Sequence, residues 1–205
     1  MCVPPFKALM PPMNRMLMLA LALAAAAGRA QDASFDAADK YLRESSFSRA
    51  CDGFGAWLKA NPSVPLFREA SAKRAAACLK VGKGAWHQEL KDLADKGEKD
   101  FARGYASWAL AERGERTFAV ALGLLKQAAG GEDRAAKQAR ELFVRGALLE
   151  MERNSWDRPK LNALCEDVLA LSPSANDKAH ARILRARAAL TDSRSAAAGE
   201  AELKA

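Results

Sequence analysis

The stretch that decides the fold is residues 41–65, YLRESSFSRACDGFGAWLKANPSVP. After the pair Ser45-Ser46, its apolar side chains return at the spacing that places them on one face of an α-helix. These side chains belong to Phe47, Ala50, Phe54, Trp57 and Leu58. The serine pair separates this helix from an earlier one that contains Tyr41, and Pro62 closes the segment. The stretch therefore predicts two consecutive helices joined by a tight turn.

The same organisation returns along the chain at a nearly constant interval. Turn residues fall at Pro62, Gly97, Gly130 and Pro173, at intervals of 35, 33 and 43 residues. No stretch between them alternates apolar and polar residues in the way that a strand requires. A period near 34 residues with a helix–turn–helix in each unit is typical of an α-solenoid. We therefore expect an all-α fold of about four helix–turn–helix hairpins and a C-terminal capping helix.

The periodicity also sets the expected boundaries. We expect helices over residues 33–45, 47–60, 66–80, 84–95, 98–113, 116–129, 133–152, 159–171 and 175–190. The last of these either caps the solenoid with a polar face or continues into a longer helical array. Residues 31–191 then form one helical-repeat domain. Residues 192–205 are small and polar, which predicts a frayed helix or a tail.

The first unit resembles the tetratricopeptide repeat, in the form found in exported bacterial helical-repeat proteins. The resemblance rests on Tyr41, Phe47, Ala50, Phe54 and Pro62, and it departs at Ser45, where the family usually has glycine, and at Trp57, where a small residue is usual. It is good over residues 35–97, fair over 133–173 and weak between them. The resemblance implies that the first helix of each hairpin lines a concave groove, which binds extended peptides or helices of partner proteins.

Residues 1–30 predict a signal peptide. Lys7 and Arg15 precede twelve apolar residues, 16–27, and small residues follow at Gly28 and Ala30. The apolar run is too short to span a bilayer as a helix, although a buried helix or a retained anchor is the alternative. Translation starts at Met1 or Met13. We expect an exported bacterial protein, periplasmic or secreted, that is soluble once the signal is removed.

Removing the signal peptide changes the charge of the chain. Residues 1–30 contain three basic residues and no acidic one, so the net charge falls from +7 to +4. That value is ordinary for a soluble domain, and export argues further against DNA or RNA as a partner. A weak preference for anionic surfaces remains.

Three cysteines remain in the exported chain. Cys51 lies one turn into the second expected helix, and Cys78 lies one turn before the end of the third. Consecutive helices of the stack run antiparallel, so the two side chains reach the same level. Either a disulfide joins them or both are buried thiols. Cys165 shares an apolar stripe with Leu161 and Val168 and is expected in the core.

Candidate contacts for a partner are few. Tyr105 and Trp108 share one face of the expected helix 98–113, where they form either a binding hot spot or core between repeats. Arg43 and Lys73 are the basic residues that we expect near the groove. Trp156, in the long turn of the fourth unit, is either exposed for contact or folded back as a plug.

The sequence contains no convincing catalytic, metal or cofactor motif. Cys78, His87 and Glu89 lack the repeated spacing of a metal site, and Gly82-Lys83-Gly84 lacks the strand and the Lys-Ser/Thr pair of a phosphate loop. We therefore expect no enzyme, no cofactor and no metal. The leading interpretation is a non-catalytic scaffolding module of the bacterial envelope that binds other proteins or peptides. The alternative is the helical N-terminal region of a larger exported enzyme or inhibitor-like protein, and a small enzyme on a helical scaffold ranks last.

Overall fold

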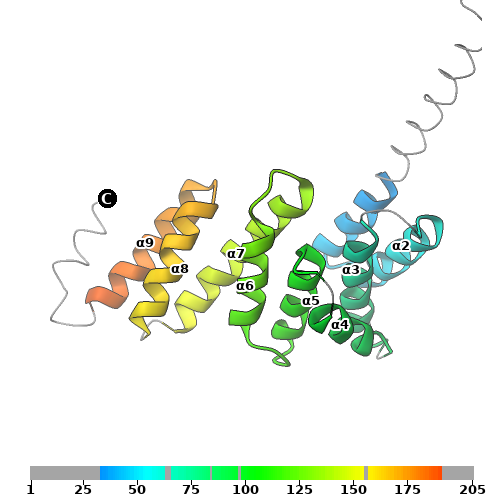
Figure 1. The fold of residues 1–205 in the computed structure, drawn as a ribbon, viewed down its shortest axis with the longest axis horizontal. Helices are drawn as coiled ribbons and strands as arrows, with labels where there is room; N and C mark the ends of the chain where they lie inside the picture. Colours follow the sequence, from blue (N-terminus) through cyan, green and yellow to red (C-terminus); the bar gives the residue numbers. More distant parts are fainter. Residues whose placement is uncertain (1–32, 63–65, 84, 97, 155–156, 191–205) are drawn as a thin grey trace, which may run out of the picture.

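The computed structural model describes residues 33–62, 66–83, 85–96, 98–154 and 157–190, and all regular secondary structure in these ranges is helical (Figure 1). A first helix covers residues 33–43. The others are α2 (Phe47–Ala60), α3 (Phe67–Lys80), α4 (Trp86–Asp95), α5 (Phe101–Glu112), α6 (Phe118–Ala128), α7 (Arg134–Arg153), α8 (Arg158–Leu171) and α9 (Ala175–Leu190). The predicted all-α class and solenoid-like arrangement are confirmed. The expected signal peptide and C-terminal tail lie outside the described ranges.

The helices stack in two layers. Each helix packs on its neighbour in sequence, and in addition α3 contacts α5, α5 contacts α7, and α7 contacts α9. Across the described ranges, α2, α4, α6 and α8 make no such contacts with one another. The odd-numbered helices therefore lie closer to one another than the even-numbered helices do. This bends the stack, with the odd-numbered layer on its concave side. We call helix 33–43, α3, α5, α7 and α9 the inner helices.

Aspartates set where several helices begin. The side chains of Asp100, Asp133 and Asp157 accept hydrogen bonds from the backbone N–H three residues later, at 2.9, 2.7 and 3.2 Å. Each therefore satisfies one of the backbone donors that a helix start leaves without a partner. The expected helix 98–113 begins three residues late, at Phe101, because Asp100 is its cap.

Small residues let the inner helices approach each other. In α3 every residue from Glu69 to Leu79 except Arg74 is buried, and five of them are alanines. Helix α5 is equally enclosed and has alanine at 102, 106, 109 and 111. A helix covered on several sides cannot be amphipathic, and alanine brings its neighbours close with little loss of side-chain entropy. The core is thus a chain of three linked apolar clusters along the stack.

The turns inside the first three hairpins share one hydrogen-bond pattern. The N–H groups of Ser46, Lys83 and Glu115 donate to the carbonyl oxygens five residues earlier, at 2.8, 3.0 and 3.0 Å. The residue before each donor has a positive φ: 59° at Ser45, 80° at Gly82 and 75° at Gly114. This is the Schellman helix end, which favours glycine at that position. Ser45 therefore holds a left-handed conformation that glycine adopts more easily, and it ends the first helix at residue 43 instead of 45.

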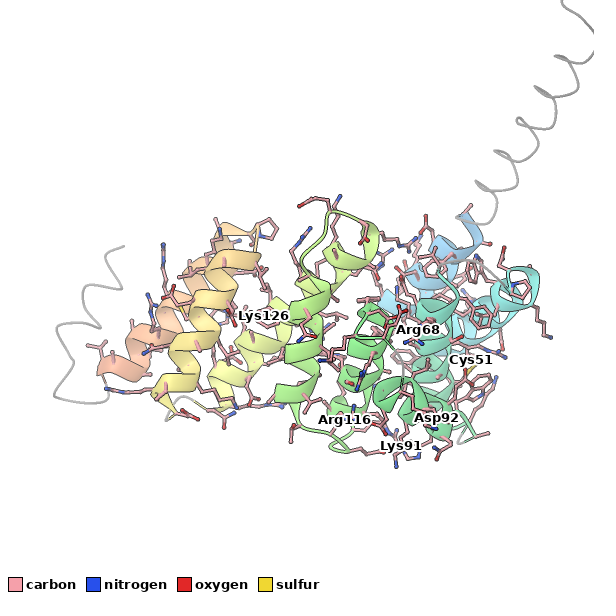
Figure 2. The ribbon with its side chains drawn as sticks, in the orientation of Figure 1. Cys51, Arg68, Lys91, Asp92, Arg116 and Lys126 are labelled. Carbon is pink, nitrogen blue, oxygen red and sulfur yellow. A yellow bond between two sulfur atoms is a disulfide. The ribbon has the colours of Figure 1, made fainter. Side chains whose placement is uncertain are left out.

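Arginines close several helix ends by binding backbone carbonyl groups. Arg116 donates to the carbonyl of Ala94 at the end of α4, Arg140 to that of Ala129 after α6, and Arg158 to that of Ala188 in α9, at 3.2, 2.9 and 2.8 Å. Arg116, near the end of the segment between α5 and α6, reaches the end of α4 (Figure 2). Charged donors at helix C-termini satisfy free carbonyls and oppose the helix dipole.

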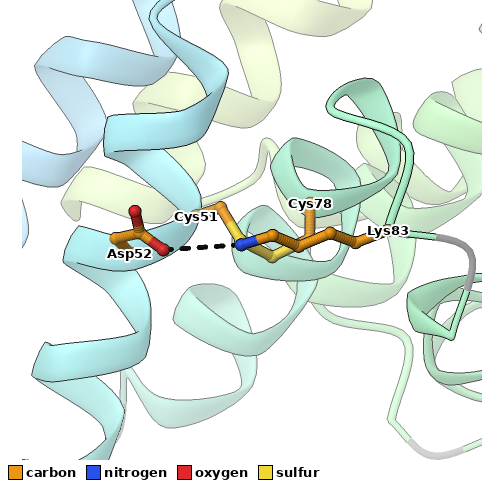
Figure 3. Close-up of a disulfide and its surroundings, with 4 residues drawn as sticks. All are labelled: Cys51, Asp52, Cys78 and Lys83. Atoms are coloured by element: carbon orange, nitrogen blue, oxygen red, sulfur yellow. Dashed lines mark hydrogen bonds and ion pairs between the residues drawn. A yellow bond between two sulfur atoms is a disulfide. The ribbon is translucent and has the colours of Figure 1, made fainter.

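A disulfide joins Cys51 of α2 to Cys78 of α3, with the Cα atoms 5.0 Å apart (Figure 3). Both cysteines are buried. The ammonium of Lys83 lies 3.5 Å from the Cys51 sulfur and 3.5 Å from a carboxylate oxygen of Asp52. The bond links the first hairpin to the second, as the antiparallel packing predicts. Cys165 is fully buried in the core, also as predicted, and takes no part in this bond.

We predict that Ser45→Gly stabilises the chain by about 0.5–1 kcal/mol, because it relieves the left-handed backbone. The matched control is Gly114→Ala, which should cost about 1 kcal/mol, since its Cβ meets nothing within 4 Å and only the backbone conformation is affected. Urea denaturation measures both changes. Loss of stability in Ser45→Gly would contradict the assigned turn.

Cys51→Ser should lower the free energy of unfolding by about 3–4 kcal/mol, because the bond closes a loop with a sequence separation of 27 residues. Cys51→Ser/Cys78→Ser should cost little more than either single change, since the bond is lost once. Thermal denaturation of non-reduced protein measures this, with mass spectrometry to count free thiols. Additive losses, or a wild-type chain with both thiols free, would refute the pairing.

Candidate functional site

A pocket of about 550 Å³ opens on the concave side of the stack, and we call it the inner pocket. Residues of helix 33–43, α3, α5 and α7 form most of its wall, with Leu90 of α4 and the turn at Ser45 and Phe47 completing it. Its lining mixes apolar side chains with long charged ones. Four of the inner helices thus contribute to one cavity.

Four of the five predicted contact residues line this pocket: Arg43, Lys73, Tyr105 and Trp108. They come from three different inner helices, namely helix 33–43, α3 and α5. Trp156 lies outside the described residues. The structure therefore brings the other four residues together around one cavity, whereas their role in binding a partner remains a prediction.

Lys73 lines the inner pocket and is almost completely buried. Its ammonium group donates to carboxylate oxygens of Asp39 and Glu69, both at 2.6 Å, and to the side-chain oxygen of Gln138 at 2.7 Å. The side chains of Lys73, Asp39 and Glu69 are 3%, 5% and 6% exposed. An ammonium has three protons to donate, so all of its hydrogen-bonding capacity is used. Buried charges of this kind are stable only when they are paired and hydrogen-bonded in this way.

This cluster connects inner helices that are far apart in sequence. Asp39 belongs to helix 33–43, Lys73 and Glu69 to α3, and Gln138 to α7. Arg134 of α7 also approaches the second oxygen of Asp39, at 3.4 Å. Helix 33–43 and α7 therefore meet across the concave side, and the buried polar contacts close one end of the pocket.

Aromatic rings flank the same cluster. The Lys73 ammonium lies 5.3 Å from the ring centre of Phe35 and 5.5 Å from that of Phe101, and the Arg134 guanidinium lies 4.4 Å from the Phe35 ring. Both rings are buried. Cation–π contacts of this kind add to the ion pairs where water is excluded.

Trp108 belongs mainly to the core between hairpins. It is only 4% exposed, its ring meets that of Phe118 edge-on at 5.2 Å, and its indole N–H donates to Glu112 at 3.0 Å. A Cβ on Gly146 of α7 would lie 2.2 Å from the indole ring. Glycine is therefore required at 146 so that α7 can pack on this tryptophan, and Trp108 offers little of its surface to a partner.

Tyr105 is half-buried and presents its side chain to the pocket. Burial raises the pKa of its phenol, and the negative charges of Glu112, Asp39 and Glu69 raise it further. The phenol therefore keeps its proton well into the alkaline range and is available as a hydrogen-bond donor.

A second hollow, of about 1030 Å³, lies between α7 and the turn that joins α8 to α9. Glu141 and Arg145 of α7 line both cavities. Helix α7 therefore forms a ridge between two hollows.

Neither a metal site nor a membrane span emerges from the described ranges. Their His, Cys, Asp and Glu side chains form no group of three or more that could hold a metal ion. Their helices include none with the length and hydropathy needed to cross a bilayer.

Sequence reasoning identified Lys73 but missed its partners Asp39, Glu69 and Gln138. Glu69 and Lys73 are four residues apart, a pattern that usually marks a solvated helix face. Two features of the sequence point to this cluster. The Glu69–Lys73 pair interrupts an alanine-rich run, and the separation of 34 residues between Asp39 and Lys73 matches the repeat period. Contact with Gln138, 65 residues from Lys73, follows from the curvature of the stack and from nothing local.

We predict that Lys73→Met lowers the free energy of unfolding by about 3–5 kcal/mol, because it leaves buried carboxylates without their cation. Lys73→Met/Glu69→Leu should recover a large part of this loss, since one of those carboxylates is also removed. The control is Lys80→Met on the same helix, whose exposed ion pair with Glu112 should be worth at most about 1 kcal/mol. Chemical denaturation compares the three variants, and equal effects of Lys73→Met and Lys80→Met would refute the buried cluster.

No protein-family model, curated protein or solved structure matches this chain.

Proposed function

We propose that this chain is a non-catalytic binding module that holds a peptide or protein segment in the inner pocket. The observation that carries the proposal is the convergence of four inner helices on one concave cavity, lined by both apolar and charged side chains. A cavity of about 550 Å³ is the size of a small-ligand site and accommodates a few residues of a partner. The tetratricopeptide-like pattern of the first unit supports the same function by analogy of fold.

The buried charges of the pocket favour binding over catalysis. Lys73, Asp39 and Glu69 neutralise and hydrogen-bond one another. A general base or nucleophile needs a lone pair aimed at substrate. The Lys73 ammonium donates all three of its protons to acceptors within the protein, so its role is to hold the inner helices together.

The proposed setting is the bacterial envelope. A disulfide between buried cysteines is the form expected in an oxidising compartment and is rare in the cytosol. The predicted signal peptide points to the same compartment.

Site-specific photocrosslinking in the producing cell tests the proposal. A photoreactive residue at Arg43, an exposed position that lines the inner pocket and not the second hollow, should give discrete adducts of defined mass. The matched control is Ala56, an exposed position on the outer helix α2, which should give none. Adducts from Ala56 alone, equal adducts from both positions, or adducts from neither would refute the pocket as the binding surface.

A further inference from the structure

The inner pocket is closed at one end and open at the other. Each of its four inner helices contributes a residue to the closed end: Asp39, Lys73, Phe101 and Gln138. The first three are at most 5% exposed, and hydrogen bonds or a ring contact link all of them to Lys73. A ligand therefore enters from the opposite end, which we call the mouth.

Four cationic side chains line the mouth: Arg43, Lys80, Arg113 and Arg145. Lys80 and Arg145 lie seven residues beyond Lys73 and Gln138 on their own helices, which at 1.5 Å per residue places them about 10 Å from the closed end. Arg43 is the last residue of helix 33–43, and Arg113 is the C-cap of α5, at the same end. All four side chains belong to exposed residues.

Acidic side chains lie within ion-pair distance of three of these four cations. Glu112 and Glu141 are the acidic residues of the lining at this end, against four cations. Arg43 lies 3.8 Å from Asp39, Lys80 lies 3.4 Å from Glu112, and Arg113 is hydrogen-bonded to Glu115 at 2.8 Å. That hydrogen bond, followed by one from His87, holds the pKa of Glu115 below its usual range.

Arg145 is the mouth residue whose position helix stability does not explain. Basic residues in the last turn of a helix stabilise its dipole, which accounts for Arg43 and Lys80 without any ligand. Arg145 lies in the middle of the 20-residue helix α7, where the dipole gives no such benefit. Among the described residues, no acidic side chain lies within ion-pair distance of it.

The wall between mouth and closed end is apolar. Leu42, Leu79 and Leu142 come from three different inner helices, and Tyr105 adds an aromatic ring from α5. A large apolar side chain fits such a wall, whereas a carboxylate would be disfavoured beside the buried Asp39.

We propose that the inner pocket binds an acidic peptide segment that carries one large apolar residue. The apolar side chain enters between the leucines, and carboxylates on both sides of it meet the cations of the mouth. This inference rests on the proposed function and specifies the chemistry of the partner.

Three capped, fluorescently labelled heptapeptides test it by anisotropy with the full exported protein: phenylalanine flanked on each side by three acidic residues, the same peptide with alanine at the centre, and the phenylalanine peptide with lysines as flanks. The acidic phenylalanine peptide should bind at least 10-fold more tightly than either of the others. Arg145→Glu should weaken it at least 10-fold, and Arg113→Gln should also weaken it. The control Lys99→Glu changes an exposed charge outside the pocket and should have no more than a twofold effect.

The outcomes separate the two proposals. Equal binding by Arg145→Glu and wild type, or equal binding of acidic and basic peptides, overturns the inference. Failure of all three peptides together with specific crosslinks from position 43 overturns the inference and leaves the binding function standing. Failure of the peptides without such crosslinks overturns both.

Discussion

The buried ammonium of Lys73 is the interaction on which the concave side of this molecule depends. It has three acceptors on three inner segments, at 2.6–2.7 Å, in a place from which water is excluded. A buried charge is unfavourable unless its partners are held in position, so the cluster fixes helix 33–43, α3 and α7 relative to one another. The closed end of the inner pocket follows directly from that arrangement.

Charged side chains elsewhere in the chain mainly cap the ends of helices. Aspartates begin α5, α7 and α8, and arginines bind the terminal carbonyl groups of α4, α6 and α9. Arg68 of α3 pairs with Asp100 at 2.7 Å, which joins the starts of two inner helices (Figure 2). Many of the basic side chains therefore have internal partners. Among the described residues that line the inner pocket, Arg145 is the cation with no acidic side chain within ion-pair distance.

The fold was predictable because its determinants are local. Helical spacing, the turn at Ser45 and glycines 82 and 114 can be read from neighbouring residues, and they placed most helix boundaries within two residues of those observed. The proximity of Cys51 and Cys78 was predictable because antiparallel neighbours bring them to one level, whereas the choice between a disulfide and two buried thiols was left open and the structure shows the disulfide. The binding role of the pocket residues stays a prediction. The cluster around Lys73 was not predictable, since Asp39 and Gln138 lie 99 residues apart and meet only after the stack has curved.

The most direct test of this account is the distance between helix 33–43 and α7 in solution. Spin labels at two exposed positions, Lys40 and Lys137, report it through the dipolar coupling of their electrons. The account predicts one narrow distance distribution in the unmodified chain and a broad, longer one when Asp39→Ala removes the shared acceptor. A distribution that is equally broad with and without Asp39 would show that the buried cluster does not hold the inner helices together.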